Sequence, residues 1–123
     1  MTIIEAINKV DAIKINTYTH EEKVGWLSTL DGIIYNEIIC THEGADSVEF
    51  TGYDADTPLG TALLASAPYD EVYIRYLEAQ IDEANGEIGK YQNSMALFNT
   101  AYSNFERHYN RTHMPIGKGM KYF

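Results

Sequence analysis

Cysteine is almost missing from this chain, which has a single one, Cys40, among 123 residues. A lone cysteine excludes a disulfide within the chain and is typical of a protein that works in a reducing compartment. Because Cys40 follows two isoleucines, we expect it to be a small core residue. Long hydrophobic runs are also missing, since no stretch reaches the roughly 18 apolar residues of a membrane-spanning helix. Residues 1–5 do not begin a signal peptide, so neither a membrane nor secretion is expected.

Basic residues are scarce, at nine against 18 acidic ones, and the net charge is −9. Residues 107–123 hold four basic residues and no acidic one, so the preceding 106 residues carry five basic and 18 acidic residues, a charge of −13. An acidic body repels nucleic-acid phosphates, which argues against general DNA binding. The basic end is either a solvated terminus or an arm that docks on the acidic face of another copy or of a partner. Its four basic residues are Arg107, Arg111, Lys118 and Lys121.

The patterns of known catalytic and metal sites are missing as well. His108 and His113 are five residues apart, whereas two ligands on one helix face need a spacing of about four. Asp54 and Asp56 begin like a calcium loop, but the glycine and the terminal glutamate of such a loop are not in their places. Residues 117–119 match only a small part of the sequence motif of a phosphate-binding loop. We therefore expect no enzymatic activity, no metal and no cofactor.

What the sequence does contain is helical patterning, and it predicts a small, mostly α, single domain over residues 1–123. Thr2 and Glu5 form one capping box, and Thr19 and Glu22 form another. The first predicts a short helix to about Ala12, followed by a connection over residues 14–18. The second predicts a longer helix that ends near residues 41–42 and has Trp26 beside its apolar stripe as a core anchor. That stripe consists of Val24, Leu27, Leu30, Ile34 and Ile38, with Ile33 and Cys40 as alternative members.

Residues 43–68 are predicted to form a loop of about 25 residues, because glycine, proline and acidic residues interrupt them. Val48 and Phe50 alternate with polar neighbours, which predicts at most one short strand. Leu59, Leu63 and Leu64 are expected to hold the loop against the helices. A loop of this length in a small domain is often functional or part of an interface. At the other end, residues 113–123 are predicted to be a flexible basic tail.

The strongest pattern lies between these segments, where Pro68 is expected in the first turn of a helix. Apolar residues then recur at steps of three and four without a change of phase. The unbroken phase favours one helix of roughly 40 residues, about 60 Å long. The Asn85-Gly86 pair instead favours a hairpin of two helices. The repeating residues are Ile74, Leu77, Ile81, Ala84, Ile88, Tyr91, Met95, Phe98, Tyr102, Phe105 and Tyr109.

The aromatic residues of this pattern predict an interface with another protein. A continuous helix would extend beyond a domain whose radius of gyration is about 14 Å, and its apolar stripe would need a partner. Tyrosine suits such a surface because it joins a large apolar ring to a polar tip. The candidate interface consists of Tyr91, Phe98, Tyr102, Phe105 and Tyr109, with the basic residues Arg107, Arg111, Lys118 and Lys121.

Over nearly its full length, the order of these parts resembles the small head–tail connector proteins (head-completion or adaptor proteins) of long-tailed bacteriophages and prophages. The segments that carry the resemblance are residues 3–7, residues 23–32 leading into Ile38, Asp56-Thr57-Pro58-Leu59, residues 68–73, residues 91–94 and residues 109–112. The resemblance implies a virion subunit made in the bacterial cytoplasm. It would form a ring, commonly twelvefold, between the capsid portal and the tail or the next connector component. DNA would pass without sequence-specific binding, and no cofactor or activity is implied.

A second hypothesis remains open at this stage. The same acidic, helical composition suits a small interaction module, such as a regulator or a DNA mimic, that has no part in virion assembly. A mimic should bind a basic DNA-binding protein with an affinity that falls steeply as salt rises. A connector should instead assemble into rings or bind a portal.

Overall fold

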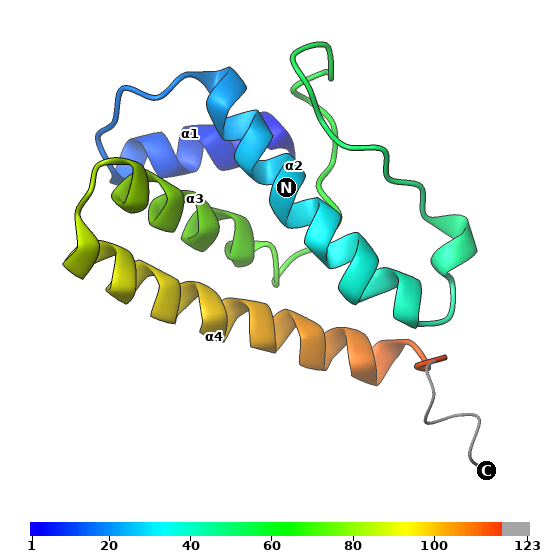
Figure 1. Cartoon of the computed structure of the whole chain (residues 1–123). Helices are drawn as coiled ribbons and strands as arrows, with labels where there is room; N and C mark the ends of the chain where they lie inside the picture. The colour runs from blue at the N-terminus through cyan, green and yellow to red at the C-terminus, as the bar shows by residue number, and fades with distance from the viewer. Residues whose placement is uncertain (117–123) are drawn as a thin grey trace.

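The computed structural model describes residues 1–116 of the chain, and it is mostly helical, as the sequence predicts (Figure 1). Four α-helices follow in order: α1 (Ile3–Ile13), α2 (His20–Glu37), α3 (Glu71–Ala84) and α4 (Ile88–Thr112). Two short 3₁₀ turns, η1 (Ile39–Thr41) and η2 (Ala45–Ser47), follow α2. Helix α3 lies at the centre of the molecule, because it contacts α1 and α2 on one side and α4 on the other.

Both predicted capping boxes are confirmed. The Thr2 hydroxyl accepts a hydrogen bond from the Glu5 backbone N–H, and the Glu5 carboxylate accepts one from the Thr2 N–H. Thr19 and Glu22 make the same reciprocal pair at the start of α2. Each box satisfies backbone donors that the first turn of a helix leaves unpaired, which fixes where these two helices begin.

The favoured expectation of one continuous helix over the second half is wrong, and the hairpin alternative is correct. Helix α3 ends at Ala84, and α4 runs back antiparallel along it from Ile88 (Figure 1). Gly86 lies in the turn with φ of 73°, a left-handed conformation that glycine adopts without steric cost. The spacing of apolar residues at steps of three and four continues across the turn because both helices direct their apolar faces to one core. Pro68 precedes the hairpin and is not in its first turn, since α3 begins at Glu71.

The predicted strand at Val48–Phe50 does not form anywhere in residues 1–116. The segment is an extended loop. Its alternation of apolar and polar residues reflects contact with α2 and with the rest of the loop. Val48 packs against the core, and Phe50 lies between the rings of Tyr35 and Tyr53. Of the three leucines expected to hold the loop, Leu63 is buried and Leu64 is half-buried, whereas Leu59 is exposed.

Two further expectations about single segments are corrected. Cys40 is exposed, because α2 gives way to η1 before this residue, and the tighter turn buries Ile39 instead. Residues 113–116 are not a free tail. The Met114 carbonyl accepts a hydrogen bond from the Glu43 N–H, and the Ile116 N–H donates one to the Thr41 carbonyl. The rest of the predicted tail, residues 117–123, lies outside the described part of the chain.

Candidate interaction surface

The predicted aromatic interface divides into an inward-facing and an outward-facing part. Phe98 and Phe105 are buried, with 9% and 3% of their surface exposed, and they belong to the chain's own core. They are therefore not available to a partner in this fold. Tyr91, Tyr102 and Tyr109 are half-buried at the margins of the same stripe.

Each of these three tyrosines is engaged within the chain. Burial and the nearby carboxylates of Glu37 and Glu106 raise the pKa of Tyr102 to about 12. A hydrogen bond to Glu83 raises the pKa of Tyr91, and burial raises that of Tyr109. Tyr102 and Tyr109 pack against the core and cover its edge, whereas Tyr91 is held by Glu83.

The basic residues of the predicted interface behave differently. Arg107 and Arg111 are exposed, one turn apart on α4, and neither forms an ion pair with any residue in 1–116. The Arg107 guanidinium donates a hydrogen bond of 2.9 Å to the Asn104 side chain, which directs it along the helix. Lys118 and Lys121 lie outside the described residues.

The two arginines line a hollow of about 400 Å³ between the segment before α3 and the C-terminal half of α4. The ring of Tyr69 stacks on His108 with centroids 4.3 Å apart, which fixes the segment against α4. Glu71 also lines the hollow, but its carboxylate is already bonded to Arg75 at 2.9 Å. We call this feature the arginine hollow; it is lined by Pro68, Tyr69, Glu71, Ala101, Asn104, Arg107 and Arg111.

The opposite charge gathers on the long loop. No lysine or arginine occurs between Lys23 and Arg75, a stretch that includes the whole of residues 24–74. Five acidic side chains of the loop are exposed, and none is in an ion pair with another described residue. We call residues 43–56 the acidic loop; its acidic residues are Glu43, Asp46, Glu49, Asp54 and Asp56.

A third surface feature is apolar and lies where the α1–α2 connection meets the α3–α4 turn (Figure 1). Ile13, Ile15 and Ile88 have exposed fractions of 61%, 96% and 70%. Lys14 bonds to Asp82 at 2.7 Å and the Tyr18 hydroxyl to Asn85 at 2.7 Å, so the connection and the turn form one end of the molecule. We call these three isoleucines the apolar end. The sequence pattern includes Ile88 only as a member of the apolar stripe, and it does not indicate Ile15 because residues 14–18 have no helical or strand period.

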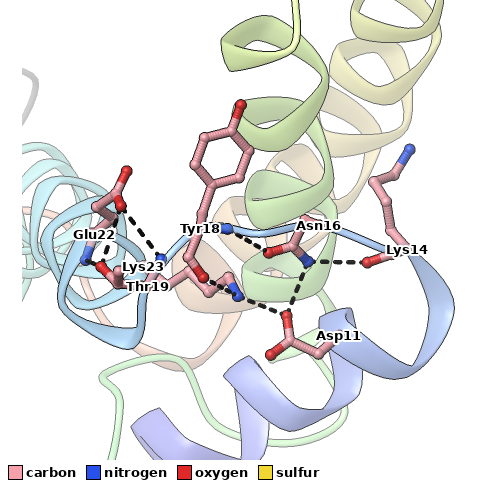
Figure 2. A network of polar contacts seen from close by, with 7 residues as sticks. All are labelled: Asp11, Lys14, Asn16, Tyr18, Thr19, Glu22 and Lys23. Carbon is pink, nitrogen blue, oxygen red and sulfur yellow. Dashed lines mark hydrogen bonds and ion pairs between the residues drawn. The ribbon is translucent and has the colours of Figure 1, made fainter.

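A polar network holds the α1–α2 connection in its shape (Figure 2). The ammonium of Lys23, only 2% exposed, donates to the Asp11 carboxylate at 2.7 Å and to the Tyr18 carbonyl at 2.9 Å. Asn16 donates to the same carboxylate at 3.0 Å and accepts from the Tyr18 N–H. Burial raises the pKa of Asp11, but the hydrogen bonds from Lys23 and Asn16 outweigh it and leave the pKa lowered. The exposed Ile15 is therefore presented by an ordered segment.

Buried ionisable groups elsewhere have structural partners and show no catalytic grouping. His42 is buried, and its Nδ1 donates to the Ile38 carbonyl while its Nε2 contacts the Asn110 side chain, both at 2.6 Å. Because a carbonyl can only accept, Nδ1 carries a proton. Asp82 accepts from Lys14 and, at 2.6 Å, from Ser94. Within residues 1–116, no three His, Cys, Asp or Glu side chains are placed to hold a metal ion.

Comparison with known proteins finds no family model, no curated protein and no solved structure that matches the chain. A search of the described helices for one long and apolar enough to cross a membrane finds none.

Proposed function

We propose that the chain is a structural subunit of a phage-type virion that assembles into a ring between the capsid portal and the tail. The order of sequence segments that resembles head–tail connectors is one support. The observation that carries the proposal is the separation of unlike surfaces: the apolar end on one side of the molecule, and the arginine hollow and the acidic loop away from it.

Separated unlike surfaces favour ring formation for a geometric reason. A symmetric dimer joins the same patch of each copy, whereas a ring joins two different patches, each copy using both. The two charged patches do not pair with themselves, since two arginine hollows or two acidic loops repel each other. The chain has such unlike patches, which is compatible with a ring subunit.

The acidic body also suits a position beside passing DNA. Outside residues 107–123 the charge of the chain is −13. Phosphates are repelled by such a surface, so DNA moving through a ring of these subunits would not adhere to it. A basic channel would instead bind DNA and slow its passage.

Sedimentation velocity with the portal protein of the same phage tests the proposal. We expect the chain to sediment with the portal ring at about one copy per portal subunit, and to stay a small species or form rings at high concentration without it. A chain that stays monomeric at every concentration and does not sediment with the portal would contradict the proposal.

A second candidate function is supported by the absence of any basic residue from positions 24–74, which gives the long loop an uninterrupted negative surface. A DNA mimic would present such a surface to a basic DNA-binding protein. Its binding to that partner should weaken steeply between low and physiological salt. Attachment to the portal should depend less on salt because shape and apolar contact contribute to it.

A further inference from the structure

We propose that the arginine hollow of one copy binds the acidic loop of the next copy, which makes this pair of surfaces the contact that closes the ring. This inference rests on the proposed function, since it names the partner that the assembly uses. The occupant of the hollow is a second copy of the same chain.

The chemistry of the hollow selects carboxylates. Arg107 and Arg111 are four residues apart, so their guanidinium groups project from the same face of α4 and can grip neighbouring carboxylates in the bidentate manner. The single acidic side chain that lines the hollow, Glu71, is bonded to Arg75, so it does not neutralise the two arginines. The hollow of about 400 Å³ is large enough for the side chains of a loop tip.

The acidic loop has the matching chemistry and is ordered before binding. At its tip, the Asp54 side chain accepts a hydrogen bond from the Asp56 N–H at 2.9 Å, and the Asp54 N–H donates one to the Thr57 hydroxyl at 2.9 Å. Nearer the body, the Tyr53 N–H donates to Ser28 on α2 at 2.9 Å. A loop already held in one shape loses less conformational freedom when it docks, which favours binding.

Within residues 1–116, no ion pair joins the acidic loop to the two arginines of the same chain. Bonds from Tyr53 to Ser28 and to the buried Asp31 fasten the loop to α2, whereas the hollow is lined by the start of α3, the segment before it and the C-terminal half of α4. Each copy thus offers a hollow to one neighbour and a loop to the other, and successive copies joined by this contact form a ring when the rotation between neighbours closes.

Reciprocal charge reversal tests the contact in the full chain. One variant carries Arg107→Glu and Arg111→Glu, and the other carries Asp54→Arg and Asp56→Arg. Association of each variant alone is measured by sedimentation velocity at an ionic strength of about 0.01 M, where charges interact over roughly 30 Å. We expect each variant to associate at least about tenfold more weakly than the unmodified chain, because like charges then face each other.

The equimolar mixture of the two variants is the decisive sample. The intact loop of the first meets the intact hollow of the second, and the two reversed surfaces are again complementary, so association should return. A control with Lys9→Glu and Lys90→Glu, which changes the net charge as much as the hollow variant, should associate like the unmodified chain. Circular dichroism of each variant verifies folding.

The outcomes separate this inference from the proposed function. Variants that associate with one another and with the portal as well as the unmodified chain does would overturn the loop-in-hollow contact and leave the ring function intact. Restored association in the mixture, combined with no binding to a portal, would support the contact and contradict the connector function. An unmodified chain that stays monomeric with and without the portal would overturn both.

Discussion

Asp31 lies at the junction of α2, α3 and the long loop, and its side chain is fully buried. Its carboxylate accepts hydrogen bonds from the hydroxyls of Tyr53 and Tyr73 and from the Leu64 N–H. Tyr73 in turn accepts from the Ala65 N–H at 2.6 Å. One carboxylate therefore attaches the loop that carries the acidic tip to the helical body. Its position in the loop-facing part of α2 could not be predicted, because a single aspartate on a helix is usually a surface residue.

Replacing Asp31 with alanine should destabilise the fold strongly. The change leaves two phenols and a backbone N–H buried without an acceptor, which costs about 3 kcal/mol or more of the free energy of unfolding. The matched control is Asp46→Ala, an exposed loop residue whose replacement should change stability by less than about 0.5 kcal/mol. Urea unfolding monitored by circular dichroism measures both. Equal effects of the two changes would contradict the structural role of Asp31.

The pH dependence of stability should carry a signature of the same residue. Burial raises the pKa of Asp31 above 3.8 by more than its three hydrogen bonds lower it. The folded chain therefore binds this proton more tightly than the unfolded chain, so the Asp31 contribution to stability decreases as pH rises from 3.8 to the raised pKa. The difference in free energy of unfolding between the unmodified chain and Asp31→Asn should show this slope above pH 3.8. A difference that does not vary with pH would contradict the raised pKa.

Among the elements, the helix starts were predictable and the hairpin was not. Capping boxes are local signals, since the residues that make them are three apart and act on their own backbone. The heptad pattern of the second half is not specific in this way. Its apolar stripe is equally compatible with one helix against a partner and with two helices against a common core, and only the Asn85-Gly86 pair distinguishes them. The exposure of Cys40 was missed because the 3₁₀ turn after α2 changes which residues face inward.

The turn of the hairpin provides a test at Gly86. Its φ of 73° is unfavourable for any residue with a Cβ atom, although no other atom lies within 4 Å of the position that Cβ would occupy. Gly86→Ala should therefore lower the free energy of unfolding by about 1 kcal/mol. Gly89→Ala is the matched control, because Gly89 lies in α4 with equally open surroundings, and this change should leave stability unchanged or raise it by up to about 1 kcal/mol. Thermal unfolding of both variants measures the two effects. If the two changes have the same effect, residues 86 and 89 lie in one continuous helix and the hairpin is contradicted.

The two faces of α4 should differ sharply in their sensitivity to truncation. Phe105 is buried against the core, so Phe105→Ala should cost about 3–5 kcal/mol of the free energy of unfolding. Leu97 is 42% exposed on the same helix, and Leu97→Ala should cost less than about 1 kcal/mol. Chemical denaturation of the isolated chain measures both. A mild effect of Phe105→Ala would mean that the aromatic stripe is covered by a partner and not by the chain's own core.

At the scale of the whole molecule, unlike surfaces are separated on a small helical body. The sequence indicated the charge asymmetry, since the counts of acidic and basic residues along the chain show it directly. It could not indicate that Arg107 and Arg111 border a hollow with Pro68 and Tyr69, because nearly 40 positions separate the two segments and only the hairpin brings them together. The apolar end likewise depends on how the α1–α2 connection meets the α3–α4 turn.

The proposed connector role predicts a defect in head-to-tail joining when the gene is removed from a phage or prophage that carries it, and this experiment tests the central claim most directly. Electron microscopy of lysates from a strain that lacks the gene should show DNA-filled heads and free tails that are not joined. Adding the purified chain to such a lysate should produce tailed particles. Tailed particles that form in normal numbers without the gene would contradict the account.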